Sequence, residues 1–137
     1  MEFAMFRNFK IIAALVMFGT GAQAQNVSIE DVITSQLQAF VDRDVTEAWQ
    51  YASPMIKGLF GTPENFGLMV RNAYPMVWDN SDVRFLDRTE LLNRTRQEVQ
   101  IQGPSGLFYI LDYQMIETPN GWQINSVQVI PAPEFFS

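Results

Sequence analysis

Residues 97–102 read QEVQIQ, and this stretch decides the fold class because an apolar side chain recurs at every second position from Val99 onward, with polar side chains between. Val99 and Ile101 fall on one face of an extended chain, while the residues between and after them are polar. Alternation with a period of two is typical of an antiparallel strand with one buried face. The same period begins at Ser81, so the second half of the chain is predicted to form a sheet.

Two turn sequences divide the rest of this half into further strands. Residues 103–106 read GPSG, and Asn120-Gly121 is the dipeptide favoured in tight hairpins. The runs that follow them, 107–117 and 122–130, are each long enough for a strand, and Pro131 ends the last one. We therefore expect three or four antiparallel strands in consecutive order.

The first half of the chain has the helical period of 3.6 instead. Ser28 is suited to cap a first helix and Asp44 a second, short one, while Thr62-Pro63 opens a third helix that ends at Pro75. A further helical turn is expected over residues 55–60. The apolar stripe of the first helix consists of Ile29, Val32, Ile33, Leu37, Phe40 and Val41.

Helices followed by an antiparallel sheet predict an α+β fold. In that architecture the helices pack on a curved antiparallel sheet, and a sheet curved over helices tends to enclose a pocket. No repeat or linker divides the chain, so residues 25–137 are expected to form a single domain that ends in a proline-containing tail, 131–137.

The first 24 residues have the pattern of a secretory signal peptide. Arg7 and Lys10 precede an apolar run, 11–18, and Ala22-Gln23-Ala24 is a small-residue cleavage site. The run is shorter than the roughly 20 residues that cross a bilayer, so we expect no membrane insertion of the mature chain and a periplasmic or secreted location. Either Met1 or Met5 could be the start.

The charge and the missing residue types exclude several classes of function. Removing residues 1–24 leaves 7 basic and 14 acidic residues, and this acidic balance disfavours nucleic acid as a partner. The chain has no cysteine and no histidine, which excludes serine–histidine–aspartate triads, thiol nucleophiles and zinc sites built on these residues. Its glycines lack the spacing of a phosphate-binding loop. We expect no metal and no cofactor.

Several short segments together resemble one known family. They are Phe40, Ala52-Ser53-Pro54, residues 60–66 (FGTPENF), Met69-Val70, residues 74–77 (YPMV) and residues 121–124 (GWQI). The pattern is similar to an uncharacterised family of exported bacterial proteins, domain of unknown function 4864. That family in turn resembles the nuclear-transport-factor-2-like, or cystatin-like, superfamily of cone-shaped α+β domains.

The resemblance implies a fold more firmly than a function. Members of the superfamily bind ligands in the cone, carry out proton-transfer or hydration chemistry, or serve only in dimerisation and protein binding. The resemblance to the domain of unknown function 4864 implies no particular biochemical activity. Function must therefore be argued from the site itself.

Asp112 is the acid best placed for catalysis, because it lies in a strand that is apolar on both faces. An apolar pocket can hold a carboxyl group at a useful pKa while a tyrosine donates to a developing oxyanion. The period of two places Tyr109 and Tyr113 on the opposite face of that strand. The alternative interpretation is that Asp112 faces solvent or pairs with Arg94 or Arg96 across the sheet.

Four aromatic residues are candidates for a ligand-binding site: Trp49, Tyr51, Tyr74 and Trp78. They occur near predicted helix ends, where they either line the mouth of a pocket or belong to the core.

These observations lead to two hypotheses about function. The favoured hypothesis is a non-catalytic module that binds a small apolar ligand or a protein, with a homodimer formed through the outer face of the sheet. The alternative is a small isomerase, dehydratase or hydrolase of apolar substrates that uses Asp112 and a tyrosine.

Overall fold

The computed structural model of the chain describes residues 27–131. The predicted signal peptide and the tail residues after Pro131 lie outside them. In chain order the described elements are α2 (Ile29–Val41), α3 (Val45–Gln50), α4 (Pro54–Phe60), α5 (Pro63–Ala73), α6 (Pro75–Trp78), β1 (Ser81–Glu90), β2 (Thr95–Gln102), β3 (Phe108–Thr118) and β4 (Gly121–Pro131). None of these helices is long and apolar enough to cross a membrane.

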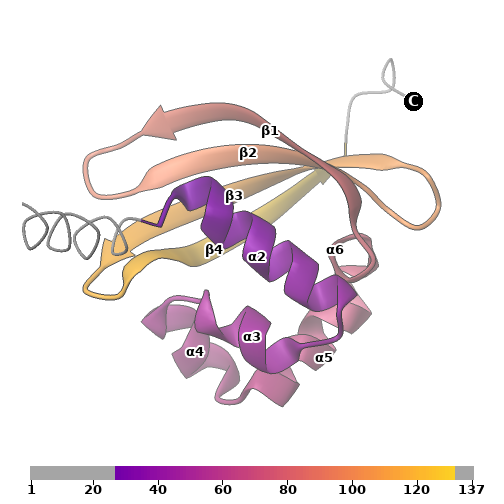
Figure 1. Ribbon diagram of the computed structural model, residues 1–137, viewed down its shortest axis with the longest axis horizontal. Coiled ribbons are helices and arrows are strands. Elements are labelled where there is room, and N and C mark those ends of the chain that lie inside the picture. Colours follow the sequence, from indigo (N-terminus) through magenta and orange to yellow (C-terminus); the bar gives the residue numbers. More distant parts are fainter. Residues whose placement is uncertain (1–26, 132–137) are drawn as a thin grey trace, which may run out of the picture.

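The predicted α+β fold is confirmed. The four described strands form one antiparallel sheet in the order β1-β2-β3-β4, and the helices all lie on one side of it (Figure 1). Helix α2 crosses the sheet, whereas α3, α4 and α5 form a group farther from β1. The sheet is open, with β1 at one edge and β4 at the other.

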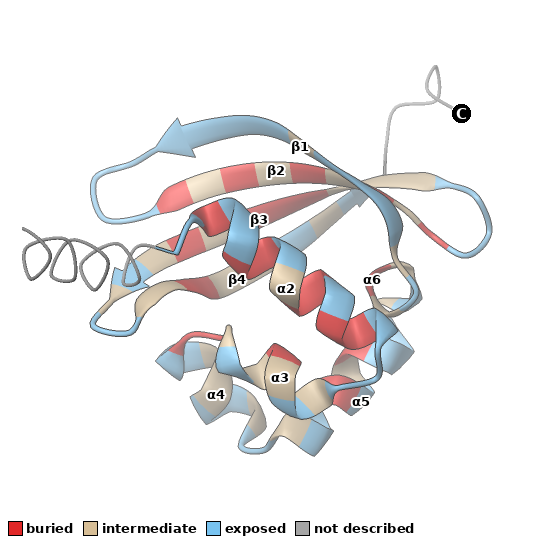
Figure 2. Ribbon diagram, in the orientation of Figure 1, coloured by how far each residue is buried: buried red, intermediate tan, exposed pale blue. Residues whose placement is uncertain are grey.

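The core lies between the sheet and the helices. Val99 and Leu111 are cross-strand partners and are fully buried, and Leu111 also faces Val129. Buried positions recur along β2 and β3 (Figure 2). From α2, the predicted stripe contributes Ile33, Leu37 and other residues. Burial of these side chains supplies the main driving force for folding. The fold thus turns one face of β2 and β3 toward the helices.

Three helix caps form as the sequence predicts. The backbone N–H of Asp31 donates to the Ser28 hydroxyl at 3.0 Å, and that of Asn65 donates to the Thr62 hydroxyl at 3.1 Å. The Asp44 carboxylate accepts from the N–H of Glu47 at 3.1 Å. These bonds satisfy amides that a helix start leaves free.

Two details differ from the sequence prediction. Pro75 ends α5 but also begins the short helix α6, since proline is well suited to the first position of a helix. The half-buried pattern expected from Ser81 onward holds in β2 but not in β1, where Phe85 alone is even partly buried. Strand β1 is an edge strand with two register shifts, so most of its side chains do not reach the helices.

Ser53 joins the helices to the edge of the sheet. Its hydroxyl donates to the Asn125 side chain at 2.8 Å and accepts from the N–H of Ile56, which caps α4. The Ser53 N–H also donates to the carbonyl of Ile124, whose own N–H donates to the carbonyl of Tyr51. The segment around Ser53 therefore covers the edge of β4 at Ile124 and fixes where α4 begins.

Candidate ligand pocket

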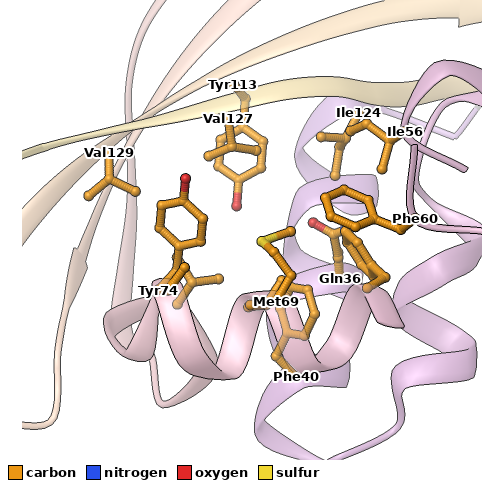
Figure 3. Close-up of a pocket in the computed structure, with 14 residues that line it drawn as sticks. Gln36, Phe40, Ile56, Phe60, Met69, Tyr74, Tyr113, Ile124, Val127 and Val129 are labelled. Carbon is orange, nitrogen blue, oxygen red and sulfur yellow. The ribbon is translucent and has the colours of Figure 1, made fainter. Parts of the chain in front are cut away.

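A pocket of about 330 Å³ lies between the helices and the inner face of β3 and β4. Its size is at the lower end of the range for small-molecule sites. The described residues that line it are Gln36, Phe40, Ile56, Phe60, Phe66, Met69, Val70, Ala73, Tyr74, Val77, Tyr113, Ile124, Val127 and Val129 (Figure 3).

Packed aromatic rings build one wall of the pocket. The ring centroid of Phe66 lies 5.9 Å from that of Phe40, 5.8 Å from that of Phe60 and 5.6 Å from that of Trp49. Phe66 is held on the inner side of α5, which begins at Pro63. Tilted ring pairs at these distances are favourable beyond the area they bury, so the rings stabilise this wall.

Lining residues are accessible to solvent between the end of α5 and β4, and also at Ile56, Phe60 and Met69. Ala73, the last residue of α5, is exposed, and Tyr74, Val127 and Val129 are each partly exposed. Phe40 and Ile124, in contrast, are only 1% exposed. A ligand that enters past Ala73 and Val127 would thus meet an increasingly buried apolar surface.

Tyr113 is the most deeply buried polar side chain of the pocket. It is 1% exposed, and its hydroxyl points from β3 into the space above α5 (Figure 3). Burial alone raises the pKa of Tyr113, with no hydrogen bond to another described residue contributing. Desolvation disfavours the phenolate, so the group stays neutral and able to donate a hydrogen bond.

Gln36 supplies a second polar atom, from the middle of the apolar stripe of α2. It is 3% exposed, and its Nε2 donates to the carbonyl of Ala48 at 3.1 Å. A carbonyl can accept only from the amide nitrogen, so this bond fixes which end of the side chain faces Ala48. The Oε1 atom is consequently turned toward the pocket, as Figure 3 shows.

Comparison with known proteins places the chain in a family. Residues 22–136 match a family described as a domain of unknown function, DUF4864. The chain belongs to this DUF4864 family. No curated protein and no solved structure is similar enough to count as a match. The wider resemblance of the DUF4864 domain to the nuclear-transport-factor-2-like superfamily stays a prediction.

Asp112 does not line the pocket of this DUF4864 domain. It lies on the outer face of the sheet, opposite Glu98 and Gln128 on the neighbouring strands. Its carboxylate is buried there and accepts two hydrogen bonds from the Arg96 guanidinium, one of them from Nε at 3.2 Å. The hydrogen bond to Asp112 and the attraction of its charge raise the pKa of Arg96. The interpretation of Asp112 as a partner of Arg96 across the sheet is confirmed.

The four candidate aromatic residues are not brought together. Tyr74 lines the pocket, and its hydroxyl points toward β4 (Figure 3). Trp49 packs on Phe66 behind the pocket wall. Tyr51 and Trp78 do not line the pocket, although the Trp78 ring packs on the lining residue Phe40 with 6.1 Å between ring centroids.

Tyr51 and Trp78 form contacts near the ends of the helices. The Tyr51 hydroxyl donates to the Glu47 carboxylate, and chiefly this bond, together with burial, raises the pKa of Tyr51. The Arg43 guanidinium lies over the Trp78 ring, 4.6 Å from its centroid, and pairs with Asp79. The Tyr51 bond thus lies within α3 and its C-cap, whereas the Trp78 contact joins the loop after α2 to the end of α6.

Two polar residues of the pocket, Gln36 and Tyr113, were not among the site residues predicted from the sequence. Gln36 interrupts the apolar stripe of α2, and that single polar residue at a core position was a readable signal. Tyr113 was assigned to the face opposite Asp112, but that face was not identified as the one toward the helices. Among the described residues, no cluster of histidine, cysteine, aspartate and glutamate could hold a metal ion.

Proposed function

We propose that this domain binds a small apolar molecule in the pocket between α5 and β4, without catalysing a reaction on it. The observation that carries the proposal is the Tyr113 hydroxyl, which points into this apolar pocket from a buried ring and forms no hydrogen bond with another described residue. A hydroxyl that faces a pocket and has no protein partner is free to form a hydrogen bond with a ligand that enters.

The surrounding surface supports the same proposal. Tyr113 sits among apolar side chains, including Met69, Val127 and Val129, and nothing in the lining has the chemistry of a general base. Carboxylates are the bases that this histidine-free chain could use most readily, and the candidate Asp112 is engaged with Arg96 on the other face of the sheet. The pocket therefore favours binding over acid–base catalysis.

The uncharged fluorescent probe N-phenyl-1-naphthylamine tests the proposal. We expect one probe to bind per chain with a Kd on the order of 10 μM, accompanied by a rise in its fluorescence. Val127→Trp places a large side chain in the lining of the pocket and should weaken binding at least about tenfold, because a bulky ring takes the space of the probe. Titration of the probe at constant protein concentration measures both effects.

Gln128→Trp is the matched control, since Gln128 is exposed and lies next to Val127 but on the outer face of the sheet. Probe affinity should stay within about twofold of the unsubstituted protein. Equal affinity for the two tryptophan variants would refute binding in this pocket.

A homodimer through the sheet is a second candidate function, and it is supported by apolar residues on the outer face. Ile110 and Ile130 are direct cross-strand partners there, and Ile130 is 40% exposed. An exposed apolar patch on a sheet favours cover by a second copy of the chain. Light scattering during size-exclusion chromatography should then give twice the monomer mass, and Ile130→Lys should halve it. A monomer at high protein concentration contradicts this proposal.

We also propose export of the chain, because residues 1–24 have the pattern of a signal peptide. Export would set the compartment in which the ligand is met. The intact mass of protein recovered from the periplasm tests it, since a mass that retains residues 1–24 would contradict cleavage after Ala24.

A further inference from the structure

The pocket offers no charge to a ligand. None of the described residues that line it is an aspartate, glutamate, lysine or arginine. Placing an ionised group among such side chains costs far more than placing a neutral one, because an apolar surface replaces none of the lost hydration. The part of the ligand that reaches the interior is therefore uncharged.

The polar atoms that these two buried residues, Tyr113 and Gln36, turn toward the pocket have complementary hydrogen-bonding roles. The Tyr113 hydroxyl is neutral and can donate, while the Gln36 Oε1 can only accept. A ligand carbonyl or ether could accept from Tyr113 but would leave the Gln36 oxygen without a donor. A hydroxyl group can accept from one and donate to the other, and it carries no charge.

We propose, resting on the proposed function, that the ligand is an uncharged alcohol or phenol with an apolar body, whose hydroxyl group is recognised by Tyr113 and Gln36. The pocket volume of about 330 Å³ limits the size of that body. It corresponds to roughly eleven water volumes, which suits a ligand of roughly ten to seventeen non-hydrogen atoms.

Four naphthalene derivatives of the same shape test this specificity by competition with N-phenyl-1-naphthylamine. 2-Naphthol can donate and accept, 2-methoxynaphthalene can only accept, naphthalene can do neither, and 2-naphthoate is charged. At pH 7 we expect 2-naphthol to bind about fivefold more tightly than 2-methoxynaphthalene, because it adds a hydrogen bond to Gln36. Naphthalene should be weaker again by a similar factor, and 2-naphthoate at least 100-fold weaker than 2-naphthol.

Tyr113→Phe tests the donor directly while it keeps the ring in place. Its affinity for 2-naphthol should fall about fivefold, whereas its affinity for naphthalene should stay the same. Tyr109→Phe is the matched control, because Tyr109 lies on the same face of β3 and does not line the pocket. That variant should retain the preference for 2-naphthol over naphthalene.

The outcomes separate this inference from the proposed function. Equal affinities for naphthalene and 2-naphthol, tight binding of 2-naphthoate, or an unchanged preference in Tyr113→Phe would each overturn the hydroxyl recognition while pocket binding stands. If the probe itself fails to bind, the proposed function is wrong and the inference is lost with it.

Discussion

Gln97→Leu should lower the free energy of unfolding by about 2–3 kcal/mol, because it removes several hydrogen bonds that hold β1 on the sheet. Gln97 is 1% exposed, and its Nε2 donates to the carbonyls of Leu86, Asp87 and Glu98 at 3.2, 3.4 and 3.0 Å. Its Oε1 accepts from the Arg88 side chain at 2.8 Å. Leucine can form none of these bonds.

The effect should be concentrated in β1. The carbonyls of Leu86 and Asp87 lie within the register shift between Phe85 and Arg88, where the ladder to β2 is interrupted. A bulge leaves backbone groups without strand partners, and the Gln97 amide replaces those partners. Hydrogen exchange of β1 amides should therefore accelerate more than that of β3 amides.

Gln100→Leu provides the comparison, since Gln100 is in the same strand but on the outer face, opposite Ile110. We expect a change of less than about 0.5 kcal/mol in urea unfolding. If Gln97→Leu unfolds at the same urea concentration as the parent, the bulge is held by the backbone alone and this explanation is wrong.

Much of the fold could be predicted because local patterns and tertiary packing agree. The period of two in β2 and the turn at Asn120-Gly121 predict the meander, and the caps at Ser28 and Thr62 predict where helices begin. The sequence patterns could not predict how far the side chains of β1 are buried against the helices. That depends on its position at the edge of the sheet, which no property of its own sequence specifies.

The site was harder to predict, because a pocket is made by residues that are distant in the chain. Tyr113 and Gln36 belong to β3 and α2, and only the packing of those elements brings both side chains to one cavity. Asp112 was predicted as a catalytic candidate because its neighbours in the strand are apolar. A shift of one position in a strand reverses the face, so Asp112 points away from the helices while Tyr113 points toward them.

The burial of Tyr113 also has a consequence for stability in alkali. The ordinary tyrosine pKa is 10.0, and burial raises the pKa of Tyr113 above it in the folded protein. Above pH 10 the unfolded chain releases this proton while the folded chain retains it. The folded state then binds more protons than the unfolded state, and its stability falls as pH rises.

Tyr113 should therefore contribute its full share of stability below pH 10 and lose that share progressively above pH 10, by at most about 1.4 kcal/mol for each pH unit. Tyr51, whose pKa is also raised, adds a loss of the same sign. The difference in unfolding free energy between Tyr113→Phe and the parent isolates the first contribution, because phenylalanine has no proton to release. That difference should be constant from pH 7 to 9 and shift in favour of the variant above pH 10.

The same experiment bears on ligand recognition. A hydroxyl that stays protonated throughout the range from pH 6 to 9 donates its hydrogen bond at constant strength, so the affinity for naphthalene derivatives that do not themselves titrate should not change across that range. Parallel stability curves for the parent and Tyr113→Phe up to pH 12 would mean that the hydroxyl titrates as it does in water. In that case Tyr113 would already be hydrated in the folded protein, and the pocket would hold water at the position assigned to the ligand.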